Sequence, residues 1–166
     1  MTKAGFMMKL QDTQNLPLSA YPLFSGTDIE LSRRALSRIF NPVFLEPAKK
    51  EKSFQFSVNG VKLPNLWISS LYYKGNPVLG PVDPSNYHTL QLIPSGSLNF
   101  DVDGNKISAT EQQGLMLSSG QRIRVRPTDD SQCLSLVVKD AYLRDVISTW
   151  TGHSKIPSIQ FQKQLT

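Results

Sequence analysis

The sequence offers few side chains of the types that catalyse reactions or hold metal ions. Its two histidines, His88 and His153, fall in different predicted elements, and neither has a second histidine at ligand spacing. The single cysteine, Cys133, lies in the apolar run CLSLVVK, where a buried, unreactive thiol is the usual outcome. Asp129 and Asp130 fall in a turn rich in Pro, Asp and Ser, where water surrounds their carboxylates. We therefore expect no catalytic residues, no metal site and no cofactor.

Three arginines alternate with apolar residues in the second half of the chain. Arg122, Arg124 and Arg126 share one face of a predicted strand, and Ile123 and Val125 lie on the other. Such a stripe can touch phosphate groups, and it equally suits the solvated outside of a barrel. No aromatic side chain is interleaved to stack on bases. We therefore expect no direct contact between this chain and nucleic acid.

Alternation of apolar and polar residues predicts that most of the chain is β-structure. The candidate strands cover residues 53–58, 65–73, 87–93, 97–102, 105–109, 115–117, 121–126 and 133–139. Asn59 with Gly60, and Asp103 with Gly104, are predicted to form turns. Residues 74–85 are predicted to be a turn-rich connection. About eight strands with even turn spacing predict a β-sandwich or a jelly-roll barrel.

One helix is predicted on each side of these strands. The first begins with a capping box of Thr27 and Glu30 and ends before Pro42. The second runs from Asp140 to a C-cap at Gly152. It carries an apolar stripe at helical spacing. The stripe consists of Leu143, Val146, Ile147 and Trp150.

The composition is that of one globular domain. The chain has 166 residues, of which 39% are hydrophobic and 19% charged. We expect residues 1–24 to form an N-terminal arm and residues 25–166 the domain. One cysteine fits a reducing compartment, and no apolar run approaches the ~18 residues of a membrane span. We therefore expect a cytoplasmic protein without a membrane partner.

The order of these elements resembles the N-terminal effector-binding domain of AraC/XylS-type bacterial transcription regulators. The resemblance spans about Phe24 to Phe161. It is carried by SGTDIELSRRALSRIFNPVFLEP, LWISSLYYKG, YHTLQLIPSGSLNFDVDG, QQGLMLSSGQRIRV and LSLVVKDAYLRDVISTWTG followed by IPSIQF. It implies a mainly β, cupin-like jelly-roll barrel that binds a small effector and is not an enzyme. It also implies a longer protein that forms a homodimer and binds DNA through a C-terminal helix-turn-helix domain, which this chain does not contain.

The comparison with cupins also implies which residues face the inside of the barrel. Thr89 stands where the usual cupin metal site has glutamate, and Ile123 stands where it has a later histidine, so the resemblance implies no metal. Tyr87, Thr89 and Gln91 would supply a phenol, a hydroxyl and an amide to an otherwise apolar chamber. The expected ligand-binding residues are Tyr87, Thr89, Gln91, Ile123, Val125, Trp67 and Tyr73.

Several functions stay open. In the first, an unidentified small organic effector enters the chamber, orders the N-terminal arm or residues 74–85, and so controls DNA binding. In the second, the barrel is filled, its polar groups bond to one another, and the domain is a ligand-free protein–protein or dimerisation module that uses the stripe of the second helix. Packing of that stripe against the barrel would remove the docking face. A third function, that of a cupin enzyme, requires a bound metal.

Overall fold

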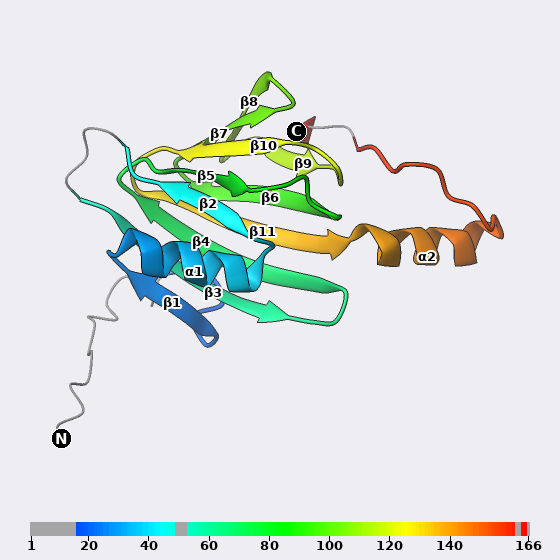
Figure 1. Ribbon diagram of the computed structural model, residues 1–166, viewed down its shortest axis with the longest axis horizontal. Coiled ribbons are helices and arrows are strands. Elements are labelled where there is room, and N and C mark those ends of the chain that lie inside the picture. Colours follow the sequence, from blue (N-terminus) through cyan, green and yellow to red (C-terminus); the bar gives the residue numbers. More distant parts are fainter. Residues whose placement is uncertain (1–15, 49–52, 162–163, 166) are drawn as a thin grey trace.

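The computed structural model describes residues 16–48, 53–161 and 164–165 (Figure 1). The described elements are β1 (Pro22–Gly26), α1 (Ile29–Ile39), β2 (Val43–Glu46), β3 (Gln55–Lys62), β4 (Leu66–Lys74), β5 (Val78–Pro81), β6 (Tyr87–Ser95), β7 (Ser97–Val102), β8 (Asn105–Thr110), β9 (Gly114–Leu117), β10 (Ile123–Pro127), β11 (Ser131–Lys139), α2 (Asp140–Thr151) and β12 (Gln164–Leu165). The prediction of a mainly β fold with one helix on each side of the main run of strands is confirmed.

The described strands form two antiparallel sheets around a shared core. One sheet has the order β1-β3-β4-β11-β6-β9-β12, and the other has the order β2-β5-β10-β7-β8. Phe56, Val58 and Leu71 from the first sheet and Leu79 and Phe100 from the second belong to one buried cluster. Burial of these alternating apolar faces is what holds two sheets together. The fold is a mainly β, two-sheet structure of the jelly-roll kind that the sequence predicts.

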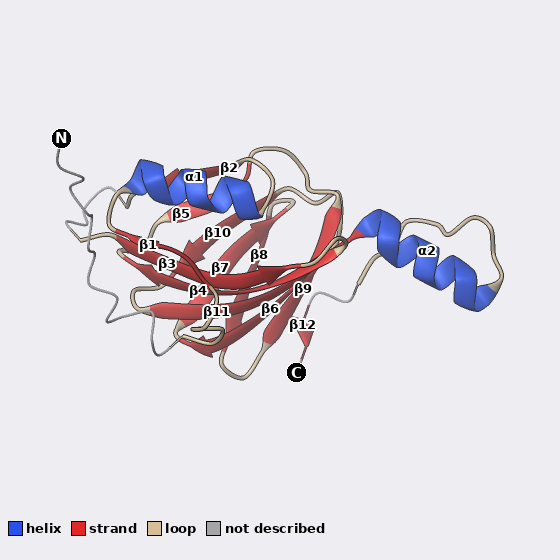
Figure 2. Ribbon diagram, turned by 90° about the horizontal axis from the view of Figure 1, so that it is seen from below, coloured by secondary structure: helices blue, strands red, loops and turns tan. Residues whose placement is uncertain are grey.

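Helix α1 connects an edge strand of one sheet, β1, to an edge strand of the other, β2, and packs on both (Figure 2). Its Leu36 is buried in the shared core. The helix begins with Asp28 as N-cap, whose carboxylate accepts a hydrogen bond from the Leu31 N–H at 2.8 Å. The predicted capping box with Thr27 is therefore wrong by one residue. Glu30 bonds instead to arginines in the following turn.

Two stretches that the sequence marks as turns are strands. Asn59 and Gly60 continue β3, and a Cβ atom on Gly60 would lie 2.8 Å from the carbonyl oxygen of Ile68. Gly80 lies in β5, inside the predicted connection, and a Cβ atom there would lie 2.3 Å from the carbonyl oxygen of Ile123. Both glycines permit close approach of a neighbouring strand, which is the other common use of glycine in β-structure.

The start of the described chain packs on the domain. Leu16 is buried, and the Asn59 side chain donates a hydrogen bond to the carbonyl oxygen of Pro17 at 3.3 Å. Strand β1 pairs with β3 from Pro22 onwards. Residues 16–24, expected in the N-terminal arm, thus contribute to the first sheet and its surroundings; residues 1–15 of that arm lie outside the described residues.

Helix α2 follows β11 directly and projects away from the strands (Figures 1 and 2). None of its residues is buried, and Trp150 is 83% exposed. The helix ends at the predicted C-cap, Gly152, which has a left-handed φ of 69°. The chain then returns toward the sheets, where β12 pairs with β9. Neither described helix is long and apolar enough to cross a membrane.

Candidate functional site

A cavity of about 90 Å³, called the chamber below, lies between the two sheets under α1. Most of its wall is apolar because the inward faces of both sheets are apolar. The residues that line it are Leu36, Phe40, Val43, Leu71, Tyr73, Leu79, Gly80, Pro81, Ser85, Tyr87, Thr89, Gln91, Leu98, Phe100, Leu117, Ile123, Val125 and Ser135. The lining includes no Asp, Glu, Lys, Arg, His or Cys side chain.

The structure brings six of the seven expected ligand-binding residues to this wall, namely Tyr73, Tyr87, Thr89, Gln91, Ile123 and Val125. The exception is Trp67, which packs beyond the end of the chamber. The centroid of its ring lies 6.0 Å from that of Phe40 and 5.3 Å from that of Tyr87. The expectation that Trp67 walls the chamber is wrong. It shares a face of β4 with Tyr73 but lies six residues away, where the end of α1 covers the barrel.

The amide of Gln91 makes two hydrogen bonds within the protein, one through its nitrogen and one through its oxygen. Its Nε2 donates to Ser135 Oγ at 3.2 Å, and its Oε1 accepts from the Cys133 thiol. Burial raises the pKa of that thiol, which stays protonated as the donor. Gln91 and Ser135 face each other across the β6–β11 ladder. Ser135 was missed by the sequence analysis, although its alternation with Cys133 and Val137 marks it as inward-facing.

Two hydroxyls in the chamber are free of such contacts. The side chains of Tyr73 and Thr89 are 4% and 7% exposed, and within the described parts of the chain neither hydroxyl has a hydrogen-bond partner. Burial raises the pKa of Tyr73 well above its ordinary value, with a smaller contribution from Cys133. Burial also raises the pKa of Tyr87, whose hydroxyl accepts from the Asn41 N–H at 3.5 Å. The chamber therefore presents neutral donors and acceptors at neutral pH.

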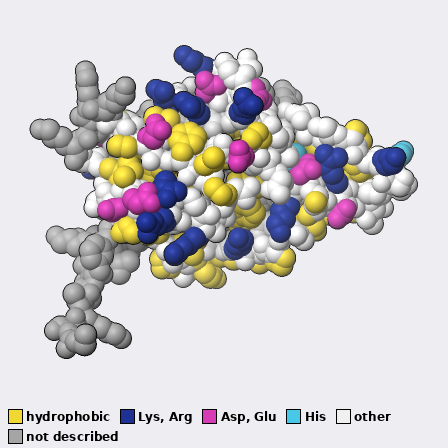
Figure 3. All heavy atoms as spheres, viewed as in Figure 1, with side chains coloured by type: hydrophobic (Ala, Val, Ile, Leu, Met, Phe, Trp, Pro, Cys, Tyr) yellow, Lys and Arg dark blue, Asp and Glu magenta, His cyan; other side chains and the backbone are white. Residues whose placement is uncertain are grey.

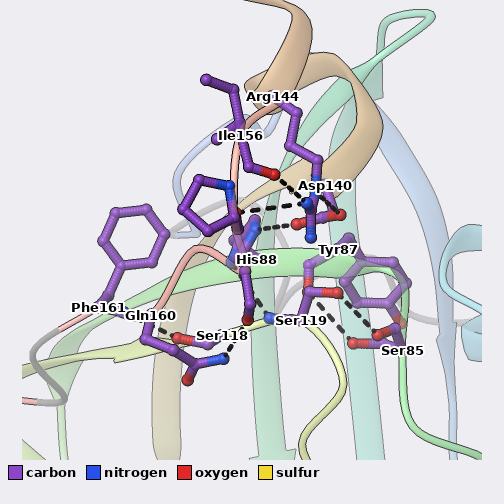
Figure 4. Close-up of polar contacts among 12 residues, drawn as sticks. Ser85, Tyr87, His88, Ser118, Ser119, Asp140, Arg144, Ile156, Gln160 and Phe161 are labelled. Atoms are coloured by element: carbon purple, nitrogen blue, oxygen red, sulfur yellow. Dashed lines mark hydrogen bonds and ion pairs between the residues drawn. The ribbon is translucent and has the colours of Figure 1, made fainter. Parts of the chain in front are cut away.

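A buried histidine lies on the opposite face of β6 from the chamber (Figure 4). His88 is fully buried, and its Nδ1 accepts a hydrogen bond from the Ser119 N–H at 3.1 Å. That donor leaves the ring proton on Nε2, which lies 2.9 Å from Asp140 Oδ1 and donates to it. The ring of Phe161 meets the imidazole edge-on, with centroids 5.1 Å apart.

Asp140, the first residue of α2, extends the hydrogen bonds of Ser119 and His88 into a connected series, called the polar chain below. Its Oδ2 accepts from Arg144 Nε at 2.6 Å, and Arg144 Nη1 donates to the carbonyl oxygen of Ile156 at 2.8 Å. Burial acts to raise the pKa of Asp140, but the hydrogen bonds from Arg144 and His88 outweigh it and leave that pKa below its ordinary value. The carboxylate thus joins β6, α2 and the returning C-terminal segment.

The same chain reaches the rim of the chamber through the turn at residues 118–120. The Gly120 N–H donates to the carbonyl oxygen of Ser85 at 2.8 Å, and the Ser85 hydroxyl donates to the carbonyl oxygen of Tyr87 at 3.2 Å. On the other side of the turn, Ser118 Oγ accepts from the Phe161 N–H at 3.0 Å. One turn therefore holds both the chamber rim and the C-terminal segment, as Figure 4 shows. Ser85 lies outside any periodic pattern, so sequence analysis gave no signal for it.

The part of the chain that the structure describes has no metal cluster, and the face drawn in Figure 3 is not uniformly basic. Across the described ranges, no group of three or more His, Cys, Asp and Glu side chains is placed to hold a metal ion. Basic and acidic side chains are interspersed over the face in Figure 3. The predicted arginine stripe is on the outside, where the guanidinium of Arg124 lies 5.6 Å from the centroid of the Phe44 ring.

Comparison with known proteins places these features in context. Residues 32–165 match the family model described as AraC-binding-like domain. The crystal structure of the AraC-like transcriptional activator CuxR has a similar fold, with a TM-score of 0.57 and 16% identity over 78% of this chain and 51% of that one. This chain therefore spans about half the length of that protein. No curated protein matches the sequence.

Cupin domains are also similar, at lower scores. The Schizosaccharomyces pombe Cnp3 cupin domain has a TM-score of 0.46 and 10% identity, over 62% of this chain and 75% of that one. A cupin 2 conserved barrel domain protein from Leptotrichia buccalis has a TM-score of 0.48 and 13% identity, over 57% of this chain and 44% of that one.

Proposed function

The chain belongs to the family of AraC-binding-like domains, and we propose that it is the effector-sensing part of an AraC-type transcription regulator. A small organic ligand binds in the chamber, and its binding controls how a helix-turn-helix domain of the full-length protein engages DNA in the cytoplasm. The observation that carries this proposal is an apolar chamber between the sheets with inward-facing hydroxyls. Such a combination is what a small-molecule site requires.

We further propose that the domain senses its ligand without transforming it. No side chain of the chamber lining is a usual metal ligand or an acid or base that ionises near neutral pH. Elemental analysis of the purified protein tests this part, since the cupin-enzyme alternative requires a bound metal. A stoichiometric metal would overturn it.

The polar chain through His88 supplies a route from the chamber to the C-terminal segment. A ligand that displaces Ser85 or Tyr87 alters the backbone that the turn at residues 118–120 holds. That turn also holds Phe161, so the docking of residues 152–161 changes with it. A ligand shifts such an equilibrium only by its difference in affinity for the two states. The ligand must therefore bind more tightly when the segment is docked, or when it is released.

A fragment screen followed by hydrogen exchange tests the proposal. We expect chamber ligands to change amide protection in residues 81–85 and 156–161, and Val125→Phe, which fills the chamber, to abolish binding. Arg124→Gln on the same strand faces outward and serves as the matched control. Urea unfolding verifies that both variants fold. The proposal fails when no fragment binds in a way that Val125→Phe blocks.

A dimerisation role is a second candidate, and one observation favours it. The stripe of α2 is not buried against the barrel: Leu143, Val146 and Ile147 are only half-buried, and Trp150 is 83% exposed. A second copy of the chain is the partner we propose for this face. Sedimentation of wild type and Trp150→Ser tests it. Concentration-dependent association that the variant loses supports the role, and a wild-type monomer at all concentrations contradicts it for this chain.

A further inference from the structure

The chamber lacks any group that could neutralise a charged ligand. The nearest arginines of β10 point to the outside of the second sheet, whereas Ile123 and Val125 of the same strand point inward. The phenols of Tyr73 and Tyr87 remain protonated because burial raises the pKa of each. A carboxylate or an ammonium group in the chamber would lose its water without gaining a counter-ion. That loss costs several kcal/mol for a buried ion.

The hydrogen-bonding capacity that remains for a ligand is small and well defined. Gln91 donates one N–H to Ser135 and accepts from Cys133, so only its second N–H and the second lone pair of its oxygen remain for a ligand. Among the described residues, the hydroxyls of Tyr73 and Thr89 have no hydrogen-bond partner. Across from them on β11 lie Ser131 and Val137, which are six residues apart, so the two hydroxyls serve separate ends of the chamber.

The size of the chamber adds a further limit. Its volume of about 90 Å³ is well below the roughly 300–1,000 Å³ of ordinary ligand pockets. A ligand of more than a few heavy atoms must displace lining side chains, at a cost in packing. The wall is otherwise formed by aliphatic and aromatic side chains such as Leu71, Leu98 and Phe100.

We propose that the chamber binds small, uncharged, mainly apolar molecules with one or two hydrogen-bonding groups, such as alcohols, ketones or amides, and excludes carboxylates. This inference rests on the proposed function and names its ligand class. The hydroxyl of Thr89 or that of Tyr73 bonds to the polar group of the ligand. The remainder of the ligand fills the apolar part of the chamber.

Matched pairs of neutral and charged probes test the proposal by NMR chemical-shift titration at neutral pH. Isobutyramide with isobutyrate, and benzamide with benzoate, differ in charge but hardly in shape. We expect the amides to shift the signals of chamber residues and each carboxylate to bind roughly tenfold more weakly or worse. Val125→Phe should abolish the shifts that arise from the chamber.

Variants that delete single hydroxyls test the two bonding positions. We expect Tyr73→Phe or Thr89→Val to weaken amide binding roughly 3- to 10-fold, and Thr89→Ser to retain it. Tyr72→Phe is the matched control, because Tyr72 is the neighbour of Tyr73 on β4 but bonds to Asp130 on the outside. Wild-type affinity in both Tyr73→Phe and Thr89→Val would overturn the assignment of the hydroxyls.

The remaining outcomes separate this inference from the proposed function. Carboxylates that bind in the chamber as tightly as the amides, and are lost in Val125→Phe, overturn the ligand class and leave effector sensing in place. No chamber shifts with any probe, charged or neutral, in a folded wild-type protein overturn both.

Discussion

The histidine between β6 and α2 has its two ring nitrogens in different roles. His88 Nδ1 accepts from Ser119 and its Nε2 donates to Asp140, so each link can be removed separately. The side-chain oxygen of an asparagine at this position can replace Nδ1 as acceptor, and the side-chain nitrogen of a glutamine can replace Nε2 as donor. We expect His88→Ala to lower the free energy of unfolding by about 2–4 kcal/mol. We expect His88→Asn and His88→Gln each to recover about 1 kcal/mol of that loss.

Urea unfolding of the three variants measures these differences. Hydrogen exchange of residues 156–161 gives a second readout, because only a link to the C-terminal segment changes protection there. Equal stability of His88→Ala and wild type would show that the polar chain contributes nothing to the fold.

Asp140 makes the stability of the domain depend on pH. Its pKa is lowered in the folded chain, so the carboxylate stabilises the fold above its unfolded pKa of about 3.9 and ceases to do so as pH falls through the folded value. We expect the free energy of unfolding to fall from about pH 5 to about pH 2 more steeply in wild type than in Asp140→Asn. His88 and Arg144 are the groups that face this carboxylate in the wild type, and both are kept in Asp140→Asn.

Urea unfolding over this pH range measures the two slopes. Asp145→Asn is the control, because it removes an exposed carboxylate from the same helix. Parallel slopes for wild type and Asp140→Asn would contradict the prediction.

Among the elements, β5 shows how a strand can depend on one small residue. Gly80 lies between β2 and β10, and any Cβ atom there would press on the Ile123 carbonyl oxygen, 2.3 Å away. We expect Gly80→Ala to lower the free energy of unfolding by about 1–3 kcal/mol. Lys106→Ala, on the exposed edge of β8, should change it by less than about 0.5 kcal/mol. Urea unfolding measures both, and equal effects would contradict the account of β5.

The sequence predicts the long strands better than the short ones. Strands β4, β6, β7 and β11 are six to nine residues long and are either rich in β-branched, aromatic or other apolar residues or alternating, and all four were predicted. Strands β1, β2 and β5 were missed because they are short and show no alternation, and β5 contains Gly80 and Pro81, whereas the equally short β9 and β10 were predicted. Such strands exist through pairing with distant partners, and no local pattern specifies that pairing.

The site residues, too, fall into those that a local pattern predicts and those that only distant pairing brings together. Tyr87, Thr89 and Gln91 could be placed together because residues two apart share a strand face. Leu36 and Phe40 line the chamber only because α1 spans the gap between the sheets, and the sequence of α1 does not encode where it docks. The bond from His88 to Asp140 joins residues 52 positions apart, so it likewise has no local signature.

At the scale of the whole molecule, a ligand in the chamber contacts both sheets and α1 together. It binds the folded state alone, because the unfolded chain has no chamber, and so it should stabilise the entire domain. At a free concentration of 100 times its dissociation constant the gain is about 2.7 kcal/mol. We expect thermal unfolding to shift upward by an amount that depends on ligand concentration. A melting temperature that stays constant under saturating chamber ligand would contradict this.

The mainly apolar wall of the chamber has a consequence for a homologous series of alcohols. Uptake should follow oil–water partition, because each methylene transferred from water gains about 0.8 kcal/mol, roughly a fourfold rise in affinity per carbon. The rise should end at the chain length that fills the cavity of about 90 Å³, since each further carbon either displaces lining side chains or extends toward solvent. The domain would then select alcohols by the length of their hydrocarbon chain. Isothermal titration along the series would locate the length at which affinity stops rising.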